Sequence, residues 1–180
     1  LWLNAAYAGN NERVTVQVER WLENRREAQR LRQGLPAEPG FVVTPTVRRI
    51  LDLLGYAQAA PTMAVVSGGA GVGKSSAVEH YARSNPNVWV MVGEPACRSP
   101  NAMLARLTEV VGMGPKVGSL RSRAVVQRLT GTGGLLILDE AHHYPTPVLD
   151  QVRYIHDQAG IGGALLGNPG IYARLEGVLA

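Results

Sequence analysis

Cysteine, lysine and long apolar runs are scarce in this sequence of 180 residues. Cys97 is the single cysteine, so no disulfide can form within the chain and a secreted disulfide scaffold is excluded. No apolar run approaches the roughly 18 residues that a membrane-spanning helix needs, and no signal peptide is visible. These absences fit a reducing compartment, and we expect a cytoplasmic protein without a membrane partner.

Arginine, not lysine, carries nearly all of the positive charge. The 18 basic residues include only Lys74 and Lys116 as lysines, and the formal net charge is +4. Residues 61–130 hold 8 basic and 3 acidic side chains, whereas residues 131–180 hold 2 and 5. The middle of the chain is a positive block, for which a polyanion such as nucleic acid is a candidate partner. Arginines that merely keep helix surfaces solvated would give the same pattern.

Short apolar segments alternate with helical patterns after Pro61. Apolar runs bounded by glycine, proline or polar residues predict strands at Met63–Ser67, Val88–Val92, Leu135–Leu138 and Gly163–Leu166. Helical spacing predicts helices at Lys74–Ser84, Asn101–Val111, Leu120–Leu129 and Pro147–Gln158, and one that begins at Gly170. Strands that are apolar throughout and separated by helices indicate an α/β fold, a parallel sheet with helices on both faces.

Two further helices are predicted before this region. Residues 11–33 show helical apolar spacing, with six arginines and four glutamates on the other faces, and Gly34 ends this helix. Residues 35–43 contain proline and glycine and predict a linker. Thr44 and Pro45 predict the start of a second helix, which runs to about Ala60. We expect a helical segment over 1–34, the linker, and an α/β domain over 44–180.

A glycine-rich segment between the first strand and its helix matches the phosphate-loop pattern G-x-x-x-x-G-K-[ST]. Its residues, with the serine that follows them, are Gly68, Gly69, Ala70, Gly71, Val72, Gly73, Lys74, Ser75 and Ser76. Glycines let successive backbone N–H groups surround a phosphate, and the next helix adds its positive N-terminus. Lys74 would reach the β- and γ-phosphates of ATP, and the Ser75 hydroxyl would bind Mg²⁺. A glycine-rich turn with a chance Lys-Ser is disfavoured, because the strand–loop–helix setting matches as well.

Two carboxylates follow the third predicted strand. Asp139 is placed to hold a Mg²⁺-bound water, and Glu140 to polarise the water that attacks the γ-phosphate. Two acids could instead cap the next helix, but a phosphate loop in the same chain favours the catalytic interpretation. One additional strand separates Lys74 from Asp139. This spacing, with the adjacent glutamate, is typical of additional-strand ATPases and not of small-molecule kinases or GTPases.

Three more polar residues lie near these motifs. Asn168 ends the fourth strand, which in this topology lies between the first and the third, so its amide would face the γ-phosphate and orient the attacking water. Asparagine after a strand is also a common turn residue. His142 and His143 follow the acidic pair; adjacent side chains point in different directions, so we expect no shared metal site. The sequence Asp-Glu-Ala-His also occurs in a class of helicases, but this chain is too short for their second motor lobe.

In combination these motifs resemble AAA+ ATPases, and in particular the target-DNA activators of phage transposition, the B transposition proteins of Mu-like phages. Besides the phosphate loop, the resemblance is carried by Leu3–Asn10, Val18–Leu22, Thr44–Ile50, Asp139–His143, Ile155–Asp157, Leu166–Asn168 and Tyr172–Leu175. It implies that residues 1–34 are the end of a helix-turn-helix region and its exit helix. It also implies a fifth strand and a helical lid with a second sensor arginine, which we do not find here, so a truncated AAA+ core is expected.

The resemblance implies a DNA-stimulated ATPase that uses ATP and Mg²⁺ in a bacterial cell. It would polymerise on double-stranded DNA, as a filament or ring, with little sequence preference, and would recruit and stimulate a transposase. Two other functions stay open: an AAA+ ATPase of a secretion or helicase-loading system, and a nucleotide-binding scaffold with little turnover.

The resemblance also suggests roles for several charged residues. Asn168 would hold the sensor 1 position, and Arg174, or more weakly Arg153, would complete the γ-phosphate site of a neighbouring subunit. The candidates for contact with the DNA backbone lie in and after a glycine-rich loop; they are Lys116, Arg121 and Arg123. Each of these arginines could instead be a solvated helix residue, and the arginine-rich helix at Arg20–Arg32 is the alternative DNA site.

Overall fold

The computed structural model of the protein describes residues 11–34, 40–94, 97–114 and 120–175. The chain divides into two units, residues 1–40 and 41–180, and the division falls inside the predicted linker 35–43. Across the described ranges, every helix is too short or too polar to serve as a membrane span.

The described part of the first unit is helix α1 (Asn11–Gly34), one residue longer than predicted. Its apolar side chains are largely exposed, among them Val16, Trp21 and Leu31. The Arg25 guanidinium lies over the Trp21 ring, 5.0 Å from its centroid, which is cation–π geometry. α1 is therefore a solvated helix of mixed charge within its own unit.

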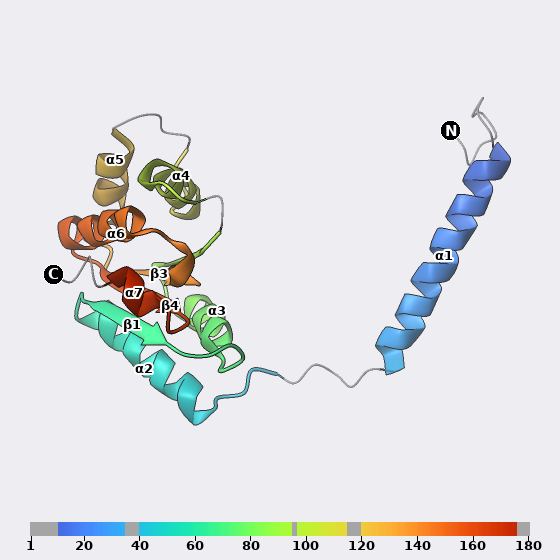
Figure 1. The fold of residues 1–180 in the computed structure, drawn as a ribbon, viewed down its shortest axis with the longest axis horizontal. Coiled ribbons are helices and arrows are strands. Elements are labelled where there is room, and N and C mark those ends of the chain that lie inside the picture. Colours follow the sequence, from blue (N-terminus) through green and yellow to red (C-terminus); the bar gives the residue numbers. More distant parts are fainter. Residues whose placement is uncertain (1–10, 35–39, 95–96, 115–119, 176–180) are drawn as a thin grey trace. The chain divides into compact units, whose positions relative to one another are not determined.

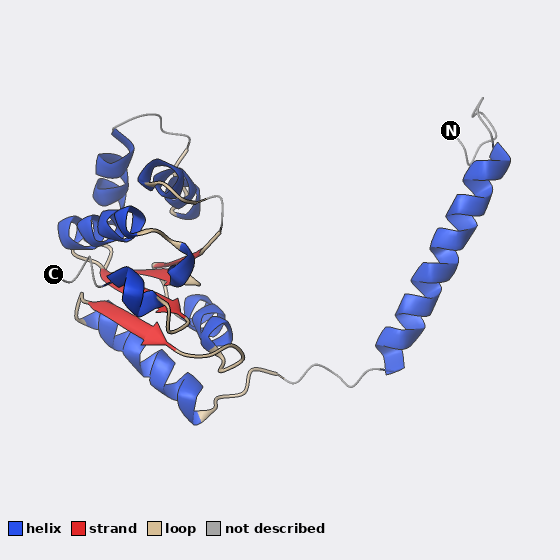
Figure 2. Cartoon of the chain, viewed as in Figure 1, coloured by secondary structure: helices blue, strands red, loops and turns tan. Residues whose placement is uncertain are grey.

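The second unit is built on a four-stranded parallel sheet (Figure 2). Its strands are β1 (Met63–Ser67), β2 (Val88–Val92), β3 (Leu135–Asp139) and β4 (Gly162–Gly167). The order is β1-β4-β3-β2, so the fourth strand lies between the first and the third, as the sequence predicts. Ser67 pairs with Gly167 and Val92 with Asp139, so the carboxyl ends of all four strands meet at one edge of the sheet.

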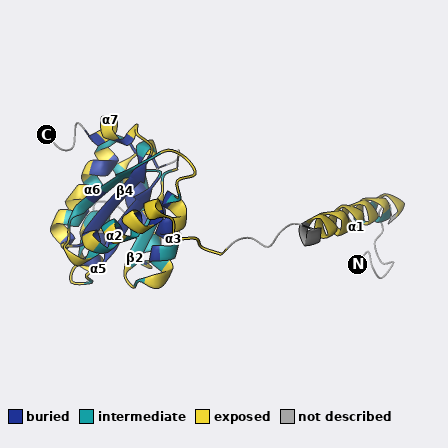
Figure 3. Ribbon diagram, turned by 90° about the horizontal axis from the view of Figure 1, so that it is seen from below, coloured by how far each residue is buried: buried dark blue, intermediate teal, exposed yellow. Residues whose placement is uncertain are grey.

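Helices cover both faces of this sheet, which confirms the predicted α/β fold (Figure 1). Their bounds are α2 (Pro45–Ala59), α3 (Lys74–Ser84), α4 (Pro100–Val110), α5 (Leu120–Leu129), α6 (Thr146–Ala159) and α7 (Ile171–Leu175). The side chains of β3 alternate between two hydrophobic clusters: Leu135 and Ile137 pack with α2 and α3, whereas Leu136 and Leu138 pack with α4, α5 and α6. Figure 3 shows the buried centre of the sheet, including β4, between helices whose outer faces are exposed.

Local sequence signals fix the helix starts. Thr44 precedes Pro45 and its Oγ1 accepts a hydrogen bond from the Val47 N–H at 3.2 Å, which caps α2 as predicted. Just before this cap, the Phe41 ring stacks on the His80 ring of α3, with centroids 3.9 Å apart and an interplanar angle of 7°. The segment that enters the second unit is thus attached to α3 as well as to α2.

Candidate nucleotide-binding site

The glycine-rich loop joins β1 to α3 and leaves the N-terminus of α3 open. Gly73 precedes the helix with φ of 94°, a left-handed conformation that favours glycine, and it provides no side-chain cap. A Cβ at Gly73 would lie 2.7 Å from Val47 Cγ2, so this position has no room for a side chain. The first N–H groups of α3 are therefore not capped by Gly73, and an anion such as a phosphate can accept their hydrogen bonds.

The ammonium group of Lys74 is held inside this loop. Its Nζ donates to the carbonyl oxygens of Gly68 at 2.8 Å and of Gly69 at 2.9 Å. Among the residues that the structure describes, the only charged side chains that are buried are those of Lys74 and Asp139. Charged groups are rarely buried without a purpose, so the burial of Lys74 and Asp139 marks this region as a functional site.

Ser75, Asp139 and Glu140 form a connected set beside the loop. The Ser75 hydroxyl donates to Asp139 Oδ2 at 2.6 Å, and the Glu140 N–H donates to Asp139 Oδ1 at 2.9 Å, so both carboxylate oxygens are engaged. Glu140 has φ of 51°, a left-handed conformation that non-glycine residues adopt at a cost and often at functional sites. The hydroxyl and carboxylate oxygens are the donor type that Mg²⁺ prefers.

One hollow of about 250 Å³ lies beside the phosphate loop. Its lining comes from the loop, from the first turn of α3 and from the residue after β3: Ala70, Gly71, Gly73, Lys74, Ser75, Ser76 and Glu140. The structure therefore brings the predicted phosphate-binding residues and the predicted catalytic carboxylate, which are far apart in the sequence, around one space.

A second hollow, of about 350 Å³, adjoins the phosphate loop on the side of α2. It is mostly apolar, and its lining is Thr46, Arg49, Ile50, Leu53, Val65, Val66, Ser67, Gly68, Val72, Lys74 and Tyr172. No single sequence motif marks this hollow, because three separate segments of the chain form it. Its size and its position next to the loop suit the base and sugar of a nucleotide.

Asn168 lies at the sheet edge where the phosphate loop begins. The pairing of Ser67 with Gly167, and the bond from the Gly68 N–H to the Gly167 carbonyl at 3.1 Å, place it alongside the loop. Its Oδ1 accepts from the Gly170 N–H at 2.9 Å, which is the turn role that asparagine often has here. The position is compatible with a sensor, and that role stays a prediction.

The expectation that His142 and His143 point apart is wrong. Both belong to the short 3₁₀ helix η2 (Ala141–His143), and this tight turn brings their ring centroids to 4.1 Å. One ligand atom from each of Glu140, His142 and His143 can be chosen so that all three lie within 4.8 Å of one another. Two imidazoles and a carboxylate suit a transition metal better than Mg²⁺, so this group is distinct from the Ser75–Asp139 oxygens.

Known proteins are similar to this chain in sequence. The family described as "AAA domain" matches residues 58–175, well over half of the chain. The chain belongs to the AAA domain family. It is 38% identical over 178 residues to the "ATP-dependent target DNA activator B" of Escherichia phage Mu and, again at 38%, to that of Escherichia phage D108. It is 36% identical over 178 residues to the "Mu-like prophage FluMu DNA transposition protein B" of Haemophilus influenzae.

Each alignment covers 98% of the chain, but only 56% of the two phage proteins and 61% of the prophage protein. The predicted resemblance to the B transposition proteins is thereby confirmed for the length of this chain. Membership of the AAA domain family, together with the phosphate loop, supports a nucleotide-binding and ATP-utilising domain.

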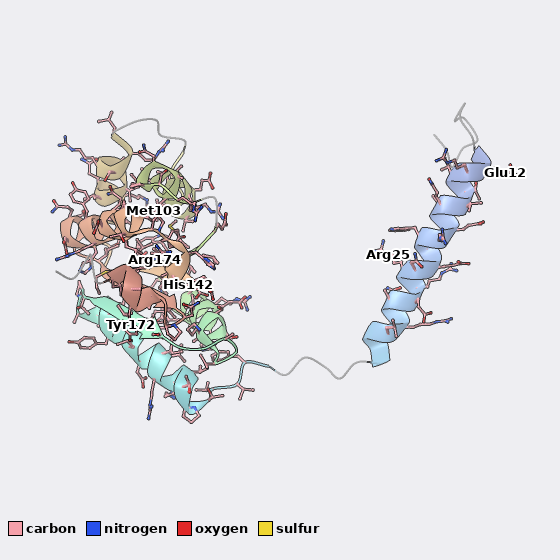
Figure 4. All side chains as sticks on the ribbon, in the orientation of Figure 1. Glu12, Arg25, Met103, His142, Tyr172 and Arg174 are labelled. Carbon is pink, nitrogen blue, oxygen red and sulfur yellow. The ribbon has the colours of Figure 1, made fainter. Side chains whose placement is uncertain are left out.

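The two candidate arginines for a neighbouring site lie on exposed surfaces of this AAA domain. Arg174 is on α7, close to η2, and its carbonyl oxygen accepts from Thr146 Oγ1 at 3.5 Å (Figure 4). Arg153 is on α6, with its Nε 4.0 Å from Asp157 Oδ2. The predicted role of each arginine is to complete the nucleotide site of another subunit. A single chain does not test this role, so both assignments stay predictions.

Two of the candidate DNA-contacting residues, Arg121 and Arg123, are on α5, which lines neither hollow beside the phosphate loop. Lys116 lies outside the described residues. Arg121 donates from Nη1 to the Asn101 carbonyl at 3.2 Å and so ties the start of α5 to the start of α4, whereas Arg123 is exposed on α5. The structure thus gives Arg121 a structural contact that the sequence does not reveal, and DNA contact by these residues remains a prediction.

Proposed function

We propose that this AAA domain hydrolyses ATP and serves a target-DNA activator in DNA transposition. The observation that carries the proposal is the hollow that the phosphate loop, the first turn of α3 with Lys74 and Ser75, and Glu140 line together. The Ser75 hydroxyl at this hollow also donates to Asp139. The names of the relatives, which describe ATP-dependent target DNA activators, support the biological role. This role is proposed for the whole protein. The chain itself aligns with 56–61% of the length of these relatives.

The phosphate-binding step follows from the contacts of the loop. The N–H groups of α3 would donate to the β-phosphate, and Lys74 would turn from the Gly68 and Gly69 carbonyls to the phosphate oxygens. This exchange replaces bonds from the ammonium group to neutral carbonyls with bonds to a charged phosphate, which adds Coulombic attraction between opposite charges. The apolar hollow beside α2 would take the base and the sugar.

The hydrolytic step follows from the carboxylates. Ser75 Oγ and, through a water, Asp139 would hold Mg²⁺, which neutralises charge on the β- and γ-phosphates when bound. Glu140 lines the same hollow and would take a proton from the attacking water as general base. The Asn168 amide would orient that water.

Two substitutions test this mechanism. Lys74→Ala removes the charge that holds the phosphates and should abolish ATP binding. Glu140→Gln should leave ATP binding intact and slow phosphate release at least about 100-fold, a typical general-base contribution. Glu79→Gln is the matched control, because Glu79 is exposed on α3 and pairs only with Arg83 at 2.6 Å among the contacts described. Hydrolysis at the native rate by Glu140→Gln would show that another group is the base.

We further propose that ATP-bound copies assemble on double-stranded DNA as a filament or ring, recruit a transposase, and use residues 1–34 as the end of a helix-turn-helix region. Electron microscopy of the intact protein with duplex DNA and a slowly hydrolysed ATP analogue tests the assembly. Ordered polymers that need both ligands are the expected result. Dispersed particles under these conditions would contradict it.

A salt titration tests the DNA contacts. Replacing Lys116, Arg121 and Arg123 by alanine should weaken binding equally for all duplex sequences, and each lost phosphate contact should reduce the slope of log affinity against log salt by about 0.9. Arg123→Ala alone separates DNA contact from the structural bond of Arg121, and Arg83→Ala on α3 is the control. An unchanged slope in the triple variant would move the DNA site to another surface, with the arginines of α1 as the first alternative.

A further inference from the structure

The imidazole of His142 lies between two groups of the nucleotide site. Its Nε2 is 3.5 Å from Glu140 Oε2, and its Nδ1 is 3.5 Å from the backbone nitrogen of Asn168. Only 16% of the His142 side chain is exposed, compared with 39% for Glu140, so the imidazole is the more buried of the two groups. His142 therefore connects Glu140, the residue after β3, to Asn168, the residue after β4.

These two contacts define the tautomer of the ring. The Asn168 N–H can only donate, so Nδ1 must accept and carries no proton. In the neutral imidazole the proton is then on Nε2, which faces Glu140 Oε2 at 3.5 Å. Both distances are at the long end of the hydrogen-bond range, so each contact contributes more to orientation than to stability.

The backbone around His142 is shaped to admit the ring. A Cβ on Gly167 would lie 3.2 Å from His142 Nδ1 and 3.4 Å from the His142 backbone nitrogen, so the imidazole packs directly over the glycine that ends β4. The turn is itself fixed, because the Gly93 N–H donates to the Asp139 carbonyl at 2.8 Å and the His143 N–H donates to the Glu140 carbonyl at 3.0 Å. In such a rigid turn the Glu140 backbone is set by main-chain bonds. The Glu140 side chain has one described ion-pair contact, to His142.

We propose that His142 is a positioning residue for the Glu140 carboxylate and that it couples this carboxylate to the position of Asn168. A displacement of the Asn168 backbone would move the ring and, through it, the carboxylate. Small displacements matter because a misplacement of about 1 Å can lower a catalytic rate by about 100-fold. The inference rests on the proposed ATP hydrolysis and adds to it a residue that does not touch the substrate.

Steady-state ATPase assays on the intact protein test this role, with binding of a fluorescent ATP analogue measured in parallel. His142→Ala should lower kcat at least about tenfold, while affinity for the analogue and the unfolding temperature stay near native. His142→Gln keeps a donor at the place of Nε2 and should recover much of the rate, whereas His142→Asn, which reaches only the place of Nδ1, should not. His156→Ala is the control, since the His156 side chain is about as buried as that of His142 and its described contacts are to Ile161 and Asp157, and it should stay within about twofold of native.

Two further variants separate positioning from simple packing. In the Glu140→Gln background, His142→Ala should cause no additional loss, because the group through which it acts is already gone. Gly167→Ala should push the ring away while both side chains remain, and should lower kcat in the same direction.

A native kcat in His142→Ala would overturn the inference and leave the proposed function standing. The same holds if the loss of kcat in His142→Ala adds in full to the loss in Glu140→Gln. A rate loss that only follows lost ATP affinity or lost stability would overturn it as well. Absence of hydrolysis in the native protein would overturn the proposed function, and the inference with it.

Discussion

The contacts of Asp139 allow a sharp prediction for the pair of variants Asp139→Asn and Asp139→Ala. The native carboxylate accepts one bond from the Ser75 hydroxyl at 2.6 Å and one from the Glu140 N–H at 2.9 Å. Asparagine offers one acceptor oxygen and one NH₂ group. With its oxygen toward the Glu140 N–H, its NH₂ faces Ser75 Oγ, which can turn and accept. Both bonds therefore survive in Asp139→Asn as neutral bonds, whereas Asp139→Ala loses both.

The magnitudes follow from these bonds. A hydrogen bond to a charged group contributes about 1.5–3 kcal/mol and a neutral one about 0.5–1.5 kcal/mol, so Asp139→Asn loses roughly 1 kcal/mol per bond. Removal of a buried charge offsets part of that loss, because Asp139 is only 4% exposed. Asp139→Ala leaves the partly buried Glu140 N–H without its acceptor, and we expect it to be about 1–3 kcal/mol less stable than Asp139→Asn in urea unfolding.

The effect on nucleotide binding should be the same in both variants. Each removes the negative charge proposed for the Mg²⁺ site, and asparagine also occupies a lone pair of Ser75. Titration of a fluorescent ATP analogue, with Mg²⁺ and with a chelator, should show a Mg²⁺-dependent gain in affinity for the native protein that falls at least about tenfold in both variants, equivalent to ~1.4 kcal/mol.

Asp150→Asn, at an exposed position of α6, serves as the control and should behave as native. If Asp139→Asn keeps the full Mg²⁺-dependent gain in affinity for the ATP analogue, the Asp139 carboxylate does not help to hold the ion, and its assignment to the Mg²⁺ site is refuted.

Three further predictions concern assembly and two buried groups. Mixing Arg174→Ala with Glu140→Gln protein should partly restore hydrolysis at mixed interfaces, and phosphate release no higher than that of the separate variants would remove Arg174 from the site. Burial raises the pKa of Tyr144 above its ordinary value of 10.0, so the group favours the folded state below pH 10 and this contribution is lost as the pH rises further. Tyr144→Phe, which removes the bond to the Val92 carbonyl at 3.0 Å, should cost about 1 kcal/mol at pH 8 and lose less stability above pH 10 than the native protein; parallel alkaline curves would refute this. Burial also raises the pKa of the Cys97 thiol, so a thiol reagent at pH 8 should label unfolded protein much faster than native protein, and equal rates would contradict the described burial.

Most of the fold could be predicted because its signals are local. Apolar runs marked all four strands, and the differences at the strand ends arise from pairing: Asp139 joins β3 because it pairs with Val92, and Gly162 joins β4 because its N–H bonds to the Gly134 carbonyl at 2.9 Å. Thr44 and Pro45 marked the start of α2 for the same reason, since a cap acts within one turn.

The candidate site was predictable only where one motif carries it. The phosphate loop and the residues after β3 are continuous in sequence, so their roles could be assigned. The apolar hollow between α2, β1 and Tyr172 could not, because its walls meet only in three dimensions. The convergence of His142 and His143, and the bond from Arg121 to α4, likewise depend on how turns and helices pack.

The stack of Phe41 on His80 has a mechanical consequence. Chain tension that arrives at residue 41 from the N-terminal side acts on α3 through this aromatic contact, and not through α2 alone. α3 has 11 residues, a rod about 16 Å long, and its first residue is Lys74. A force on the segment before residue 41 would therefore act on α3 and, through this one helix, on the end of the phosphate loop. Force on this segment and binding of a ligand in the loop would then influence each other.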